Sequence, residues 1–134
     1  MAQRRSRKLT TRQLALTAAR IAHDRHLTDV VVLDLRDISP VADYFVIATG
    51  NSDVQMRAVA DEVQQTAAKG GHRPYGEAGR ESGRWVLLDF VDVVVHLFDE
   101  EFREYYDLEM MWGDAPRVRW KRPEGATGRR SSQT

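Results

Sequence analysis

Two apolar runs rich in β-branched residues stand almost back to back in this sequence, and they restrict its fold more than any other feature. Residues 85–90 read WVLLDF and residues 93–98 read VVVHLF, with only Val91 and Asp92 between them. Runs of this length and composition predict β-strands, and so short a connection joins antiparallel neighbours. The sequence therefore predicts a β-hairpin in the second half of the chain.

Two further apolar runs, at residues 30–35 and 44–49, predict two more strands, which are separated by a break at Ser39-Pro40. A short edge strand is expected to begin at residues 72–74, since proline cannot donate to a ladder of hydrogen bonds. Helical spacing and capping residues predict helices over residues 10–26, 51–70 and 99–111. Hairpins and crossover helices together define an α/β class, a single domain with a mixed sheet flanked by helices.

The chain has 134 residues, which suffices for one hydrophobic core. We expect the domain to span residues 9–115, with flexible basic tails at residues 1–8 and 116–134, where little can be buried. No apolar window approaches the roughly 20 residues that cross a bilayer, and the chain has no cysteine. A cytoplasmic protein without membrane contact is expected.

The charges of the chain are strongly segregated, although their sum is zero. Residues 1–12 hold five basic and no acidic side chains, and residues 113–134 hold six basic and two acidic ones. The body between them holds nine basic and 18 acidic side chains. Such a body favours basic partners and disfavours nucleic acid.

A metal-dependent nucleotidyltransferase is the enzymatic alternative. It would use the loop from Gly50 to Asp53 together with a pair of carboxylates that hold magnesium. The candidate carboxylates stand at strand ends and turns, where aspartate is common: Asp34, Asp37, Asp53, Asp89 and Asp92. The chain has no Asp-x-Asp pair and no Walker sequence at this loop, and Asn51 or Ser52 also serves as an ordinary helix cap.

Surface aromatic residues indicate protein binding. Strand alternation places Trp85, Leu87 and Asp89 on one face and Val86, Leu88 and Phe90 on the other. Apolar groups beside an acid are typical of a partner-binding patch, although a helix could instead cover Trp85 and Leu87. The last predicted helix has apolar side chains on two faces, one for the sheet and one for a second chain or a partner.

Several segments, in this order, resemble the family of ribosomal silencing factors, also called RsfS or Iojap-like. They read DYFVIATGNS (residues 43–52), QMRAVADEV (55–63), WVLLDF (85–90), DVVVHLF (92–98) and REYYDLE (103–109), followed by Trp112. The similarity covers roughly residues 12–115. Two features depart from the family pattern. The residue before Asp92, often glycine in the family, is Val91 here, and the polar loop expected from Gly76 to Gly83 is built somewhat differently from the common pattern.

The resemblance implies a homodimeric α/β protein with a nucleotidyltransferase-like topology and no catalysis, metal or cofactor. It implies binding to the large ribosomal subunit through a ribosomal protein of the intersubunit face, with little direct RNA contact. Occupying that face would block joining of the small subunit and repress translation.

The family's partner-binding surface, transferred position by position, falls on Trp85, Phe90, Tyr106 and Asp107. We add Asp92 and Arg103, which stand in the same motifs. Trp85 and the second face of the last helix were also indicated by the residue pattern alone. Phe90 conflicts with that pattern, because simple alternation buries its side chain.

Overall fold

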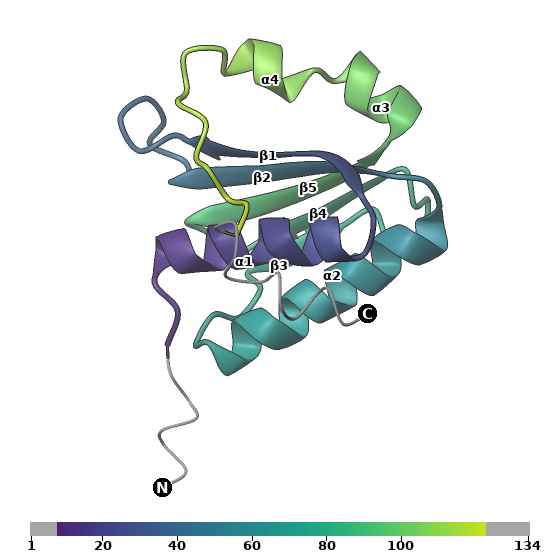
Figure 1. Cartoon of the computed structure of the whole chain (residues 1–134), viewed down its shortest axis with the longest axis horizontal. Coiled ribbons are helices and arrows are strands. Elements are labelled where there is room, and N and C mark those ends of the chain that lie inside the picture. The colour runs from purple at the N-terminus through teal and green to yellow at the C-terminus, as the bar shows by residue number, and fades with distance from the viewer. Residues whose placement is uncertain (1–7, 123–134) are drawn as a thin grey trace, which may run out of the picture.

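The computed structural model describes residues 8–122. Its helices and strands follow the predicted order, except that the last predicted helix is divided in two (Figure 1). The elements are α1 (Thr11–Asp24), β1 (Thr28–Asp34), β2 (Tyr44–Gly50), α2 (Asp53–Lys69), β3 (Gly76–Ala78), β4 (Trp85–Asp89), β5 (Val93–Asp99), α3 (Glu100–Tyr105) and α4 (Leu108–Met111).

The five strands form one mixed sheet in the order β1-β2-β5-β4-β3. β2 and β5 are parallel, and the other neighbours are antiparallel, which includes the predicted hairpin of β4 and β5. Helices α1 and α2 cover one face of the sheet, here called the inner face, whereas α3 and α4 lie over the opposite, outer face (Figure 1). The predicted α/β class with a mixed sheet flanked by helices is confirmed.

The larger hydrophobic cluster lies between the inner face and helices α1 and α2. Helices α1 and α2 each begin at a capping residue with an extended backbone. The Thr10 side chain accepts a hydrogen bond from the Gln13 N–H, and the Gln13 side chain bonds the Thr10 N–H in return. The Ser52 side chain accepts from the Gln55 N–H, so the loop after β2 is a capped helix start.

The short edge strand lies later in the chain than predicted. It comprises Gly76–Ala78 and pairs antiparallel with β4, so it falls in a segment expected to be a polar loop. Residues 72–74 precede the ladder, and its first contact is the Tyr75 N–H, which donates to the Asp89 carbonyl at 2.7 Å. Proline at position 74 has no N–H to donate, which delays the start of pairing.

The last predicted helix is interrupted at Tyr106 and Asp107. Asp107 has a non-helical backbone, and its carboxylate accepts a hydrogen bond from the Met110 N–H at 3.3 Å, so it caps α4. Asp99 caps α3 in the same way, through the Phe102 N–H at 2.8 Å. An aspartate that can bond a nearby backbone N–H competes with helix continuation, which explains the break.

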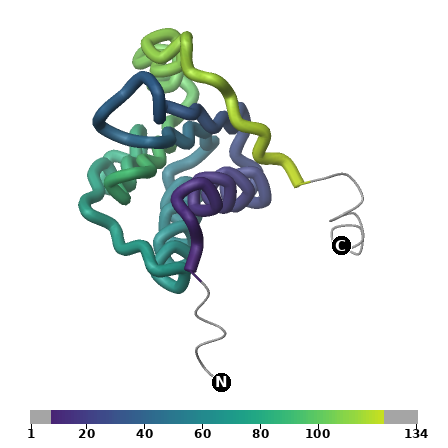
Figure 2. The backbone as a smooth tube through the Cα atoms, turned by 90° about the vertical axis from the view of Figure 1, so that its left-hand side faces the viewer, coloured from purple at the N-terminus to yellow at the C-terminus, as the bar shows by residue number. Residues whose placement is uncertain are grey.

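Residues 115–122, here called the C-terminal strap, run along the edge of β1 that does not pair with β2 (Figure 2). The Val118 N–H donates to the Val32 carbonyl at 2.8 Å, and the Trp120 indole N–H donates to the Val30 carbonyl at 3.0 Å. The expectation of a flexible tail from residue 116 is therefore wrong for residues 116–122, because Val118 and Trp120 pack against the core. The rest of that predicted tail, residues 123–134, and residues 1–7 lie outside the described residues.

The hairpin between β4 and β5 turns through a strained residue. Val91 has φ 73°, and the Asp92 N–H bonds the Phe90 carbonyl at 2.9 Å across it. A hydrogen bond between residues two apart with positive φ at the centre is the rare, strained form of γ-turn. A β-branched side chain is especially unfavourable there.

Val91→Gly is expected to raise the free energy of unfolding by about 0.5 to 1 kcal/mol. Relief of the left-handed backbone outweighs the extra entropy of glycine in the unfolded chain, and little packing is lost because Val91 is 51% exposed. Urea unfolding measures the change. Val41→Gly is the matched control, since Val41 is also exposed but does not have a positive φ; stabilisation by both changes, or by neither, would show that the turn is unstrained.

Candidate functional site

An aromatic cluster covers much of the outer face of the sheet. Cross-strand pairing places Trp85 beside Phe98 and Leu87 beside His96, so these four side chains share the outer face. Rings from β2, β4, β5 and the C-terminal helices meet there: Phe45, Trp85, His96, Phe98, Phe102, Tyr106 and Trp112. Helix α3 therefore rests on an aromatic layer.

Trp85 is half-buried at the centre of this cluster. Its ring centroid lies 4.8 Å from that of Phe98 and 4.7 Å from that of Tyr106. The sequence left open whether Trp85 and Leu87 form a partner-binding patch or are covered by a helix. In the structure α3 packs over this face, but both side chains stay half-exposed, so each alternative holds in part. The exposed parts of these side chains are available to a partner.

Tyr106 and Asp107 lie at the junction of α3 and α4, where the helix is interrupted. Tyr106 is 38% exposed and lies against both Trp85 and Tyr105. Asp107 is exposed and lines a cavity of about 460 Å³. Its walls also include the acidic residues Asp29, Glu104 and Glu109 and two arginines, Arg103 and Arg117, which both pair with Glu109. The structure thus brings Trp85 and Tyr106 into contact, and Asp107, the next residue along the chain, lines a hollow that adjoins β1.

Arg103, a further predicted binding residue, is turned inward. Its side chain is 12% exposed. The guanidinium donates to the Thr49 hydroxyl at 2.8 Å and to the Glu109 carboxylate at 3.0 Å. Arg103 therefore fixes α3 and α4 to the sheet, and its hydrogen-bonding groups are engaged within the chain.

Phe90 and Asp92 lie apart from the other predicted site residues. Phe90 is 6% exposed and belongs to the cluster beneath α1 and α2, as alternation along β4 requires, so it offers no surface to a partner. Asp92 is exposed in the hairpin turn. Trp85 begins β4 and Asp92 lies in the turn beyond its other end, so the two are separated by more than the roughly 13 Å that β4 spans at about 3.3 Å per residue.

The side chain of His96, on β5, forms a hydrogen bond within the sheet. Its Nδ1 accepts a hydrogen bond from the Trp85 indole N–H at 3.2 Å. The side chain is buried, and its Nε2 has no hydrogen-bond partner within residues 8–122. Burial lowers the pKa of His96 to about 4, so the ring is neutral at physiological pH. The predicted hairpin brings these two strands together, but the hydrogen bond between Trp85 and His96 was not predicted.

Three of the five carboxylates considered for metal catalysis have partners within the chain. Asp34 binds Arg36 at 2.7 Å, and Asp53 binds Arg57 at 2.9 Å. The Asp89 carboxylate accepts from the Val91 N–H at 2.7 Å and so supports the hairpin turn. In the part of the chain that the structure describes, no three histidine, aspartate or glutamate side chains are grouped to hold a metal ion.

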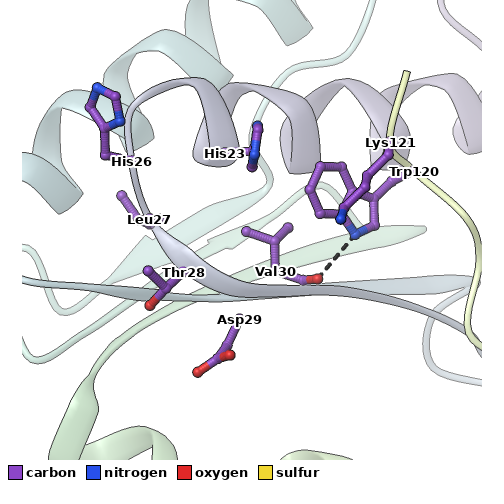
Figure 3. A pocket seen from close by; sticks show the side chains of 8 residues that line it. All are labelled: His23, His26, Leu27, Thr28, Asp29, Val30, Trp120 and Lys121. Carbon is purple, nitrogen blue, oxygen red and sulfur yellow. Dashed lines mark hydrogen bonds between the residues drawn. The ribbon is translucent and has the colours of Figure 1, made fainter. Parts of the chain in front are cut away.

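A second hollow, of about 520 Å³, lies between the end of α1, the start of β1 and the C-terminal strap (Figure 3). His23 packs on Trp120 with ring centroids 5.3 Å apart, and Trp120 also anchors the strap to Val30 (Figure 3). The Trp120 N–H already has a hydrogen-bond partner, and His23 covers part of the Trp120 ring, so we interpret this hollow as the junction between the strap and the rest of the domain.

Among residues 8–122, no helix is long and apolar enough to cross a membrane.

Comparison with known proteins gives consistent matches. A family model described as "Ribosomal silencing factor during starvation" matches residues 8–134. A protein named ribosomal silencing factor RsfS from Bacillus subtilis is 46% identical over 99 residues, which are 74% of this chain and 84% of that protein. A protein of the same name from Halalkalibacterium halodurans is 41% identical over 110 residues, covering 82% of this chain and 94% of its own length.

Solved structures agree with these matches. A crystal structure of a Chromobacterium violaceum protein is similar to this chain with a TM-score of 0.74 at 32% sequence identity. The similarity covers 88% of this chain and 93% of that one. Fold and sequence therefore point to the same group of proteins.

Proposed function

The chain belongs to the family of ribosomal silencing factors that act during starvation, and we propose that it represses translation by binding a basic protein on the intersubunit face of the large ribosomal subunit. Bound there, it excludes the small subunit by occupying the surface on which the two subunits join. The proposed contact, here called the partner surface, consists of Trp85, Leu87, Tyr106 and Asp107.

One observation carries this proposal. Two large rings, Trp85 and Tyr106, lie with their centroids 4.7 Å apart and their planes tilted by 41°, and both remain partly exposed. The acidic Asp107 follows Tyr106 directly in the chain. Aromatic residues dominate the energetics of protein interfaces, especially near their centres. An adjoining acid adds attraction to a basic partner and repels acidic competitors.

The charge of the whole body supports the same class of partner. Residues 13–112 hold 18 acidic and nine basic side chains, and the acidic hollow beside Asp107 continues this field to the partner surface. Such a field steers a basic ribosomal protein toward the contact and opposes the phosphates of ribosomal RNA. We therefore propose a contact made mainly with protein, in the cytoplasm, that acts by exclusion and not by catalysis.

We also propose that the protein is a homodimer. Ile38, Met110 and Met111 are exposed and rim a hollow of about 320 Å³ beside Trp112. This apolar area lies on α4 and on the loop between β1 and β2, close to Asp107 but without Trp85 or Tyr106 in its lining. A second copy would cover it and leave Trp85 and Tyr106 free.

Charge reversal at Asp107 tests the proposed function. We expect Asp107→Lys to weaken cosedimentation with isolated large subunits at physiological salt by at least about tenfold, because it places like charge against a basic partner. Inhibition of translation in a cell extract should fall in parallel. Since Asp107 also caps α4, Asp107→Asn is needed beside it, because asparagine caps equally well without the charge.

Asp107→Asn is expected to bind only a few-fold more weakly than the wild type, as the loss of one exposed charge costs little. Asp92→Lys carries the same charge reversal at the far end of β4 and should bind normally. Light scattering of all variants should report about twice the 15.3 kDa chain mass, which checks that the dimer persists. Full binding by Asp107→Lys would place the partner surface elsewhere.

A further inference from the structure

His96 stands at a position where a polar ring is costly. It lies on β5, flanked by Ile47 on β2 and Leu87 on β4, and it is 5% exposed. Burying a polar group without a full set of hydrogen bonds lowers stability. A phenylalanine or leucine would fill the same space in the sheet without that cost.

The hydrogen bond to Trp85 fixes where the proton of His96 resides. Because Nδ1 accepts from the Trp85 indole N–H at 3.2 Å, the neutral ring must carry its own proton on Nε2. That Nε2–H is buried, and no acceptor lies within reach among residues 8–122. The His96 side chain therefore makes one hydrogen bond and leaves its Nε2–H without an acceptor, and a buried donor without an acceptor lowers the stability of the folded protein.

A polar residue that is buried in the core without a compensating gain in stability usually has a functional role. The only polar contact of His96 in the described chain is with Trp85, the half-exposed ring at the centre of the partner surface. The rings of Phe45 and Phe98 pack against His96 with centroids 4.6 and 6.1 Å away, which holds the imidazole in one orientation.

We propose that His96 is a positioning residue for partner binding, whose Nδ1 holds the Trp85 indole in the orientation that the ribosomal partner requires. This inference rests on the proposed function. A ring fixed before binding loses less conformational freedom on association, so the fixed ring binds more tightly than a mobile one. His96 itself touches no partner atom, because its side chain lies beneath the surface.

Two substitutions separate a positioning role from a structural one. His96→Phe keeps the ring volume but removes the acceptor, so it should keep nearly normal stability while large-subunit affinity falls about tenfold. His96→Asn can place its side-chain oxygen near the position of Nδ1 and so restore the acceptor, but it leaves a gap in the sheet face. It should therefore lose stability and yet retain more affinity than His96→Phe. A merely structural role predicts that affinity follows stability in both variants.

Trp85→Phe completes a double-mutant cycle, because phenylalanine retains an aromatic ring but cannot donate to His96. If His96 acts only through the Trp85 N–H, adding His96→Phe to Trp85→Phe should not weaken binding further. The free protein offers a second readout: the Trp85 indole N–H resonance, assigned by its absence from Trp85→Phe, should be protected from solvent exchange in the wild type and lose that protection in His96→Phe.

The outcomes are distinguishable. If the wild type cosediments and His96→Phe binds equally well, or if the indole resonance and its protection are unchanged in His96→Phe, the positioning role is wrong while the proposed function stands. Failure of the wild type itself to cosediment overturns the proposed function and this inference together.

Discussion

Replacing Trp85 by alanine is expected to weaken binding to the large ribosomal subunit at least about thirtyfold, the loss typical of a central aromatic anchor. The substitution removes the exposed part of the indole and also the support on which Tyr106 rests, since the two rings lie 4.7 Å apart. Cosedimentation over a range of protein concentrations measures the loss.

Stability must be followed in the same variant, because the inner half of the indole packs on Phe98 and His96. We expect Trp85→Ala to lower the free energy of unfolding by about 2 kcal/mol, less than the roughly 3 to 5 kcal/mol of a fully buried aromatic residue. Tyr106→Ala, which removes a more exposed ring, should reduce affinity with a smaller loss of stability. Normal binding by both alanine variants would rule out the partner surface as drawn.

The second large effect concerns pH. His96 has a pKa of about 4 in the folded protein, lowered from 6.5 by burial. Between these two pH values His96 is protonated in the unfolded chain but not in the folded protein. The free energy of unfolding therefore falls as the pH is lowered from 6.5 to about 4. The difference corresponds to about 3 kcal/mol. Urea unfolding at pH 7 and at pH 4 should show this loss.

Carboxylates also titrate in this range, so the wild type must be compared with His96→Phe. The same carboxylates are present in both proteins, so their contributions largely cancel in the comparison. The wild type should lose about 3 kcal/mol more than the variant between pH 7 and pH 4. Equal losses in both would mean that His96 is accessible to protons in the folded state.

Local patterns were sufficient to predict the hairpin. The two runs at residues 85–90 and 93–98 are contiguous, and their pairing needs only a short turn. The parallel pairing of β2 with β5 is different, because it joins Tyr44 to Val93, which are 49 residues apart in the sequence. No local pattern encodes that register. The α3–α4 interruption was missed because Asp107 looks like an ordinary polar position until its carboxylate is seen to cap the second helix.

The candidate site was predicted in part. Trp85 was identified because alternation placed it beside an acid, and Tyr106 because the last helix has more aromatic residues than one face can hold. The same alternation places Phe90 in the core, and the structure agrees with it. Arg103 could not be assigned from sequence, because its role depends on Thr49, which is 54 residues away in the chain. Trp85 and His96 lie within the predicted hairpin, but the hydrogen bond between their side chains was not predicted.

The C-terminal strap has a consequence for the order in which the protein is made. The outer edge of β1 is covered only when Val118 pairs with Val32, and 86 residues separate these two positions. At about 5 to 20 residues per second, their synthesis takes roughly 4 to 17 s. Throughout that interval the nascent chain exposes an unpaired strand edge, which can pair with any neighbouring chain. Nascent chains on one messenger RNA are therefore most prone to pair with one another through β1 before their last residues are made. A chaperone that shields extended segments during this interval would raise the yield of correctly folded protein.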